Sequence, residues 1–143
     1  MKKDAGSFAA KRKPGEKADP RIAESIKGTA VEGEFSCLQA EDLVNRLQVT
    51  MEQTGVALDL LGIRISRCQL GLFGYAPESR IVKPASDVSP DLEEAIRLAL
   101  VNGRLPCVAA WSIAETFKMP RMKIAAACEA LKLKVKPCQL GAF

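Results

Sequence analysis

The sequence predicts a mainly helical protein made of two tandem trihelical repeats, each ending in one short β-strand. The first observation is a hexapeptide that begins at Cys68 and returns at Cys138, an offset of 70 residues; with that offset, 20–73 aligns with 90–143 without a gap. The second is that helix caps and apolar side chains at helical spacing recur with the same offset. A repeat of 54 residues buries only roughly 60% of its unfolded surface. We therefore expect the two repeats to pack together with pseudo-twofold symmetry.

Each repeat opens with a helix whose start is clearly marked. Asp19-Pro20 and Ser89-Pro90 both combine an N-cap residue with a proline at the first helical position. Apolar residues follow at helical spacing in both segments. Gly33 and Gly103 are expected to end these helices, because glycine readily adopts the left-handed conformation found at helix C-termini.

Two further helices follow in each repeat, with a tight turn between them. Their predicted bounds are about 39–47 and 50–61 in the first repeat, and about 109–117 and 120–131 in the second. Thr50 with Gln53 fits a capping box, and Gly62 fits a helix end. Pro120 fits the first position of a helix, where proline is tolerated.

Beyond the third helix the apolar period changes from helical spacing to two, which is typical of a short strand with one polar face. This change covers 63–67 in the first repeat and 132–137 in the second. Prolines in 74–88 indicate a linker between the repeats. Residues 1–18 mix lysine, glycine, alanine and proline without apolar periodicity, so they are predicted to form a disordered basic arm.

The segment 109–124 resembles the helix-turn-helix of DNA-binding proteins, and the whole pattern is similar to tandem helix-turn-helix proteins with a reduced wing. Ala114 sits where that family needs a small residue between its two helices, and Met119 and Ile124 occupy its usual apolar positions after the turn. The first repeat has Val44, Val49 and Thr54 at the matching places and departs from the pattern. The resemblance implies a third helix that lies in the major groove.

The charges predict different roles for the N-terminal arm and the two repeats. Residues 1–18 contain six basic and two acidic residues, which equals the formal net charge of +4 for the whole chain. The first repeat (19–73) is acidic, with five basic and eight acidic residues, whereas the second (89–143) is basic, with eight and five. A basic arm and a basic repeat favour an anionic partner.

The second repeat therefore carries the candidate DNA contacts. Arg121 and Lys123 open its third helix, where they would reach bases or phosphates. Lys132, Lys134 and Lys136 alternate along the predicted strand and would form a wing-like edge that holds phosphates. The alternative is that these cations form a solvated face. Trp111, the only tryptophan, is interpreted as core or inter-repeat packing rather than as a platform for a base.

Four cysteines recur with the repeat, which leaves three interpretations open. Cys37 and Cys68 match Cys107 and Cys138, so four thiols could chelate zinc or an iron–sulfur cluster. The chain has no histidine and no Cys-x-x-Cys, and cysteine is often a small buried hydrophobe, so buried core cysteine is favoured over a metal site or a redox sensor. Each pair brackets two helices, so we expect Cys37 near Cys68 and Cys107 near Cys138. Cys128 has no counterpart.

The sequence favours a DNA-binding protein, a transcriptional regulator that contacts double-stranded DNA through the second repeat. The alternative is a protein-interaction adaptor; the first repeat is left for a protein partner or a second copy of the chain. No nucleophile with a base and no phosphate-binding loop is visible, so neither an enzyme nor a cofactor is expected. No apolar run approaches about 18 residues and no signal peptide is visible. With five cysteines, this predicts a cytoplasmic protein without a membrane partner.

Overall fold

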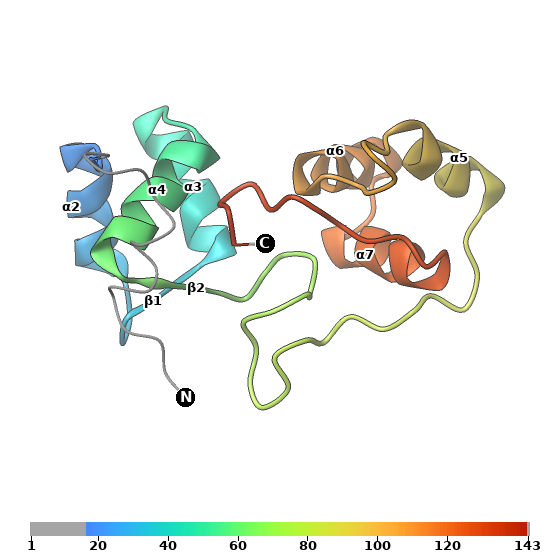
Figure 1. Ribbon diagram of the computed structural model, residues 1–143, viewed down its shortest axis with the longest axis horizontal. Coiled ribbons are helices and arrows are strands. Elements are labelled where there is room, and N and C mark those ends of the chain that lie inside the picture. The colour runs from blue at the N-terminus through green and yellow to red at the C-terminus, as the bar shows by residue number, and fades with distance from the viewer. Residues whose placement is uncertain (1–16, 143) are drawn as a thin grey trace. The chain divides into compact units, whose positions relative to one another are not determined.

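The computed structural model describes residues 17–142, which form six helices and one small two-stranded sheet (Figure 1). The expected mainly helical class is therefore confirmed. The chain divides into two compact units. The first unit contains the described residues up to Arg67 together with Leu140–Ala142, and the second contains Cys68–Gln139. Most of the predicted basic arm, residues 1–16, lies outside the described residues.

The first unit packs three helices beside a short parallel sheet. Its elements are α2 (Pro20–Thr29), β1 (Glu34–Ser36), α3 (Cys37–Leu47), α4 (Met51–Leu61) and β2 (Arg64–Ser66). The three helices contact one another, and Phe35 of β1 is buried at the centre of the sheet, opposite Ile65. Ile22, Ile26 and Leu43 are fully buried, as the helical spacing of apolar residues predicts.

Local sequence signals explain where these helices begin and end. The Asp19 carboxylate accepts a hydrogen bond from the Arg21 backbone N–H at 2.8 Å, as expected of an N-cap. The Thr50–Gln53 capping box is present in both directions, and Gly62 ends α4 with a φ of 70°. These three predictions are confirmed.

The second unit has the same order of helices. Its elements are α5 (Pro90–Leu98), α6 (Cys107–Phe117) and α7 (Arg121–Ala130). Ser89 caps α5 through the Leu92 N–H, as predicted. Pro120 is the N-cap of α7 rather than its first residue. The helix starts recur with the offset of 70 residues, and α6 also ends 70 residues after α3, whereas α5 and α7 end one residue earlier than this offset gives.

The strands differ from the expectation of one per repeat. The first unit has two strands, paired in parallel from Glu34↔Arg64 to Ser36↔Ser66. In the second unit the corresponding pairing is a single parallel bridge, Leu105↔Val135, and 132–137 is not a regular strand. The sequence missed β1 because a three-residue strand is too short for an alternating pattern to show.

Gly33 and Gly103 do not end the first helices. α2 ends at Thr29, and Gly33 instead lies in a tight turn with Glu32, where both residues have positive φ, 76° and 51°. The Val31 and Glu34 backbones close this turn by hydrogen bonds in both directions. Two successive positive φ values are typical of the hairpin turn for which glycine is favoured, so the glycine serves the turn and not the helix.

The expected boundaries, with a linker at 74–88 and a repeat at 89–143, are not those of the structural units. Residues 68–88 belong to the second unit: Cys68, Leu70 and Val82 are buried in its core. The Ala85 N–H donates to the Ala126 carbonyl at 3.0 Å. Leu140, which matches Leu70, is buried and belongs to the first unit instead. The first copy of the hexapeptide therefore belongs to the second unit, and Leu140–Ala142 of the second copy belong to the first unit.

Candidate nucleic-acid interface

A tight turn joins α6 to α7 in the second unit. Lys118 ends α6 in the left-handed conformation with a φ of 54°, and the Met119 N–H returns to the Ala114 carbonyl at 3.0 Å. Ala114 and Ile124 are buried and Met119 is partly buried. Small and apolar side chains at these positions bring the two helices together, and in the first turn of α7 Arg121 and Met122 are partly buried while Lys123 is exposed.

The N-termini of α7 and α4 differ in their N-cap residues. Pro120 provides no side-chain cap, and the first turn of α7 contains no acidic residue. At the equivalent end of α4, Thr50 caps the helix and Glu52 lies in the first turn. Uncapped N–H groups and the helix dipole favour an anion at the N-terminus. Of these two helix ends, only that of α7 is suited to a phosphate.

The two predicted residues of α7 differ in environment. The guanidinium carbon of Arg121 lies 3.7 Å from the centre of the Trp111 ring, a cation–π contact across the turn. Lys123 is exposed. Trp111 is partly buried against the core of the second unit, which agrees with the packing role expected from the sequence. Its contact with Arg121 had no sequence signal.

The three lysines of the predicted wing are exposed. Lys132, Lys134 and Lys136 alternate with the partly buried Leu133 and Val135, so the predicted alternation of faces is present without a continuous strand. Leu105 holds this segment: its N–H donates to the Lys134 carbonyl at 2.9 Å and its carbonyl accepts from the Lys136 N–H at 2.8 Å. None of the three lysines forms an ion pair with a residue between 17 and 142.

One pair of neighbouring positions carries opposite charges in the first unit and two positive charges in the second. On the sheet of the first unit, Glu34 pairs in register with Arg64, and their side chains form an ion pair. The Leu105↔Val135 bridge places Arg104 next to Lys134 in the same register. Two exposed cations thus stand side by side where the first unit has a neutral pair. Sequence reasoning missed Arg104, because its neighbour in space lies 30 residues away in the chain.

A shallow depression lies beside the turn of the second unit. Its lining includes Trp111, Lys118, Arg121, Gln69 and Tyr75. The Tyr75 hydroxyl donates to the Cys68 carbonyl at 2.7 Å, which holds the 68–75 segment in place. The Trp111 Nε1 is buried, with no hydrogen-bond partner among the residues that the structure describes. Gln69 and Tyr75 could not be predicted here, because they reach the turn only through the exchanged hexapeptide segment.

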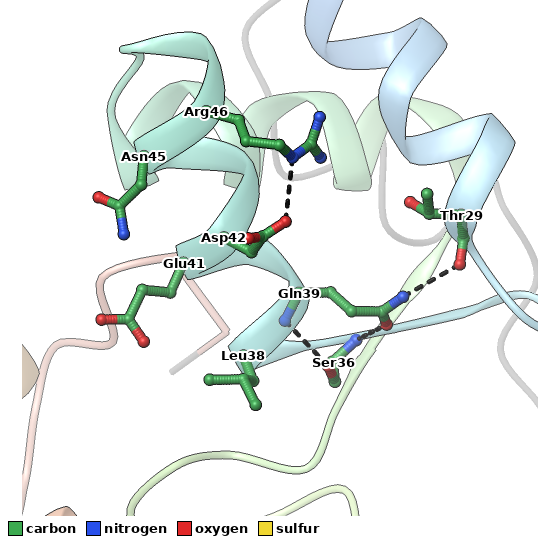
Figure 2. Close-up of a pocket in the computed structure, with 8 residues that line it drawn as sticks. All are labelled: Thr29, Ser36, Leu38, Gln39, Glu41, Asp42, Asn45 and Arg46. Atoms are coloured by element: carbon green, nitrogen blue, oxygen red, sulfur yellow. Dashed lines mark hydrogen bonds and ion pairs between the residues drawn. The ribbon is translucent and has the colours of Figure 1, made fainter.

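The described part of the first unit has an open groove of different character (Figure 2). Asp42 accepts from Arg46 at 3.0 Å, and Gln39 closes a capping box with Ser36 and donates to the Thr29 carbonyl at 3.0 Å. The exposed Leu38 lies at its rim. Because this groove contains both acidic and basic residues, and Arg46 is already paired with Asp42, it is not suited to bind an anion.

The two acidic residues of α4, Glu52 and Asp59, differ in exposure. Glu52 is exposed, but Asp59 is only 3% exposed. Asp59 is therefore not part of the surface. We expect its substitution to change the stability of the first unit and not the affinity for DNA.

The cysteines are mostly buried. Cys37, Cys68, Cys107 and Cys128 are buried and Cys138 is partly buried; none forms a disulfide. Burial raises the pKa of Cys107 and of Cys128 to about 11, and it also raises the pKa of Cys68. The Gln139 amide donates to the Cys107 sulfur at 3.5 Å, which places Cys138 close to Cys107, as expected. Cys37 and Cys68 belong to different units, so their expected proximity stays a prediction.

Within residues 17–142, no group of three or more histidine, cysteine or acidic side chains is arranged to hold a metal ion. The four-thiol metal site therefore has no geometric support. None of the described helices is long and apolar enough to cross a membrane.

No family model, curated protein or solved structure matches this chain.

Proposed function

We propose that the protein binds double-stranded DNA through the second unit, as a transcriptional regulator of the tandem helix-turn-helix kind. The observation that carries the proposal is the charge reversal beside the wing-like segment. Arg104 and Lys134 share a register in which the first unit has the ion pair Glu34–Arg64. Like charges in adjacent positions repel each other, and a bound phosphate removes that repulsion.

The turn between α6 and α7 also favours DNA binding through the second unit. α7 begins with an uncapped N-terminus and carries Arg121 and Lys123 in its first turn. In helix-turn-helix proteins this part of the second helix of the motif reaches base edges, while flanking cations hold phosphates. Lys118 lies at the turn itself and is exposed. Phosphate contacts at both ends of α7 would fix its register on the duplex.

The two units are interpreted as repeats related by an approximate twofold axis. The recurrence of the helix starts and of the parallel pairing, Phe35↔Ile65 and Leu105↔Val135, supports this interpretation. Superposition of residues 20–73 on 90–143 in an experimental structure tests it. A different order of helices, or no rotation relating the units, would contradict it.

A charge swap tests the proposed function with little risk of unfolding. Arg104→Glu places an acidic residue beside Lys134, as Glu34 stands beside Arg64, so the second unit gains an exposed ion pair worth at most about 1 kcal/mol. We expect the variant to melt at or above the wild-type temperature and to bind a random-sequence duplex at least about tenfold more weakly at low salt. Fluorescence anisotropy measures the binding.

Lys27→Glu is the matched control, because it makes the same change of charge on the exposed face of the first unit. It should retain affinity within about threefold, since only the general field of the protein changes. Equal losses in both variants would show that net charge, and not this surface, holds DNA. Absence of salt-dependent binding by the wild-type protein would reject the proposed function.

The adaptor alternative is favoured by a different observation. Val31 and Leu38 are exposed in the first unit, and the residues at the same offset, Val101 and Val108, are exposed in the second, each by more than half. Exposed apolar side chains retained at equivalent places are suited to a protein partner. If the wild-type protein binds no DNA across the salt titration, these exposed apolar side chains become the leading candidates for contact with a partner.

A further inference from the structure

Two thiols stand at the two ends of the segment that contains α6 and α7. Cys107 is the first residue of α6, and Cys138 follows the lysine-bearing segment 132–136. Both belong to the second unit. We infer that these two cysteines form a disulfide when the protein meets a peroxide, so that the second unit contains a site of reversible oxidation. The inference goes beyond DNA binding and does not depend on it.

The backbone holds the two cysteines next to each other. The Cys107 N–H donates to the Pro137 carbonyl at 3.0 Å, and the carbon of that carbonyl is bonded to the Cys138 nitrogen. With standard bond lengths, this hydrogen bond keeps the two Cα atoms within about 7 Å of each other. Cα atoms joined by a disulfide lie about 4.4–6.8 Å apart. The pair can therefore be bridged with little movement of the backbone.

The Cys107 side chain faces the segment that carries Cys138. The Gln139 side-chain amide donates to the Cys107 Sγ at 3.5 Å. Cys107 is 4% exposed. Burial is the main reason that its pKa rises to about 11, and the charges of Cys138 and Cys68 raise this pKa further. Three thiols of the second unit therefore lie in one neighbourhood, and Cys138 is the partly exposed member.

Cys68 is the competing partner for Cys138. Its own N–H donates to the Phe73 carbonyl at 3.1 Å, and its carbonyl accepts from the Tyr75 hydroxyl at 2.7 Å. Both bonds tie Cys68 to the loop that follows it, whereas the backbone of Cys107 is tied to the residue before Cys138. We therefore assign the disulfide to Cys107.

The exposure of the two thiols gives the order of the steps. Hydrogen peroxide meets the partly exposed Cys138 first: its sulfur attacks one peroxide oxygen, the O–O bond breaks, and a sulfenic acid and one water form. The Cys107 sulfur then attacks the sulfenic sulfur. The S–S bond forms as the S–O bond breaks, and the hydroxyl leaves as a second water with the Cys107 proton. The two thiols lose two electrons, which reduce one peroxide to two waters.

The disulfide would close a loop around α6 and α7 and would fasten the end of the lysine-bearing segment to the start of α6. A closed loop restricts the unfolded chain, so the oxidised unit should be the more stable one. With the offset of 70, the matching cysteines are Cys37 and Cys68. These two belong to different units, so of the two cysteine pairs only Cys107 and Cys138 share one unit.

Peptide mapping tests the inference directly, because trypsin leaves the five cysteines on five different peptides. Cys107 lies on 105–118 and Cys138 on 135–143, within which the lysine–proline bond resists cleavage. The reduced full-length protein is treated with hydrogen peroxide at neutral pH, alkylated and digested without a reductant. We expect 105–118 linked to 135–143, two fewer alkylated thiols, and a melting temperature at least about 5 °C above that of the reduced protein. Dithiothreitol should restore all five thiols.

Single variants separate the roles of the thiols. Cys107→Ala should leave a sulfenic acid on Cys138 that dimedone traps, because the thiol that would resolve it is missing. Cys138→Ala should form no linked peptide in the same time. Cys128→Ala is the matched control, since it removes a buried thiol of α7, and it should form the same disulfide as the wild type. Cys68→Ala should form it too. Thermal melting establishes which variants are folded.

Three results would overturn the inference: a link from 135–143 to 68–80 instead of 105–118, the same linked peptide missing after peroxide treatment of the wild type, or its loss in a folded Cys68→Ala variant. If Cys107→Ala does not fold, mapping of the wild type and of Cys138→Ala, whose site is partly exposed, decides the question. None of these measurements involves DNA, so a failure of the proposed function and a failure of this inference are seen separately.

Discussion

Single residues at equivalent positions determine how the two units differ. Thr50 closes the N-terminus of α4 with its hydroxyl, and Pro120 at the matching place has no group that could do so. Glu34 neutralises Arg64, whereas Arg104 adds to Lys134. Neither substitution alters the order of helices, since caps and exposed strand residues contribute only about 1 kcal/mol each. The chemistry of a surface can therefore change while its fold remains.

Because of its buried thiols, the protein should become less stable as the pH rises into the alkaline range. Burial raises the pKa of Cys107 and of Cys128 to about 11 in the folded state, against an ordinary value of 9.0. The unfolded chain therefore loses these protons first. Their contribution to stability is complete below pH 9 and decreases as the pH rises from 9 to 11, by at most about 1.4 kcal/mol per pH unit for each thiol.

Urea unfolding at pH 8 and pH 10.5 measures this decrease. Cys128→Ala removes one of the two thiols, so the difference in the free energy of unfolding between the two pH values should become smaller. An unchanged difference in this variant would show that other groups, such as lysines, cause the alkaline loss.

At the scale of an element, the lysine-bearing segment 132–136 should hold phosphates without reading bases. Substitution of Lys132, Lys134 and Lys136 by glutamine should weaken binding to all duplexes alike. It should also flatten the slope of log affinity against log salt by about 0.9 for each lost phosphate contact. A salt titration on specific and random duplexes measures both effects. A loss confined to the specific site would assign these lysines to base contacts.

The helix α4 is adapted to the C-terminal segment of the chain. A Cβ atom at Gly55 would lie 2.1 Å from the Leu140 carbonyl oxygen, so only glycine allows this approach. We expect Gly55→Ala to lower the free energy of unfolding by about 1–3 kcal/mol, because the backbone of 140–142 must move away. Urea unfolding and carboxypeptidase susceptibility measure the two consequences.

Gly28→Ala in α2 is the matched control, because no atom lies within 4 Å of its added Cβ. Alanine is the better helix former, so this variant should gain about 0.5–1 kcal/mol. If Gly55→Ala were also stabilising, the C-terminal segment would not be held against α4.

At the scale of the whole molecule, the exchanged hexapeptides predict crossed effects. Leu70 belongs to the first repeat but is buried in the second unit, and Leu140 belongs to the second repeat but is buried in the first unit. Replacing either with alanine should cost about 2–5 kcal/mol. Leu70→Ala should lower protection mainly in α5–α7, and Leu140→Ala mainly in α2–α4.

Hydrogen exchange followed by mass spectrometry resolves the two units. Loss of protection within the repeat that carries the substitution, instead of the other one, would contradict the exchange.

Much of the local structure could be predicted from the sequence. Asp19 and Ser89 cap their helices, Thr50 forms its capping box, and Gly62 ends α4. These signals act within four residues, so a sequence displays them directly. Gly33 was misinterpreted because a left-handed glycine serves a helix end and a tight turn equally well.

The sequence by itself determined the order of the helices, the tight turn before α7 and the lysines near it, because caps, periodicity and charge are properties of neighbouring residues. Only the tertiary structure decided the register that brings Arg104 next to Lys134, the stacking of Arg121 on Trp111 and the exchange of Leu70 and Leu140 between the units. The two hexapeptides are nearly identical in sequence, and each could pack on the helices of either repeat. Local sequence signals are nearly the same for both choices, so the choice depends on contacts between residues far apart in the chain.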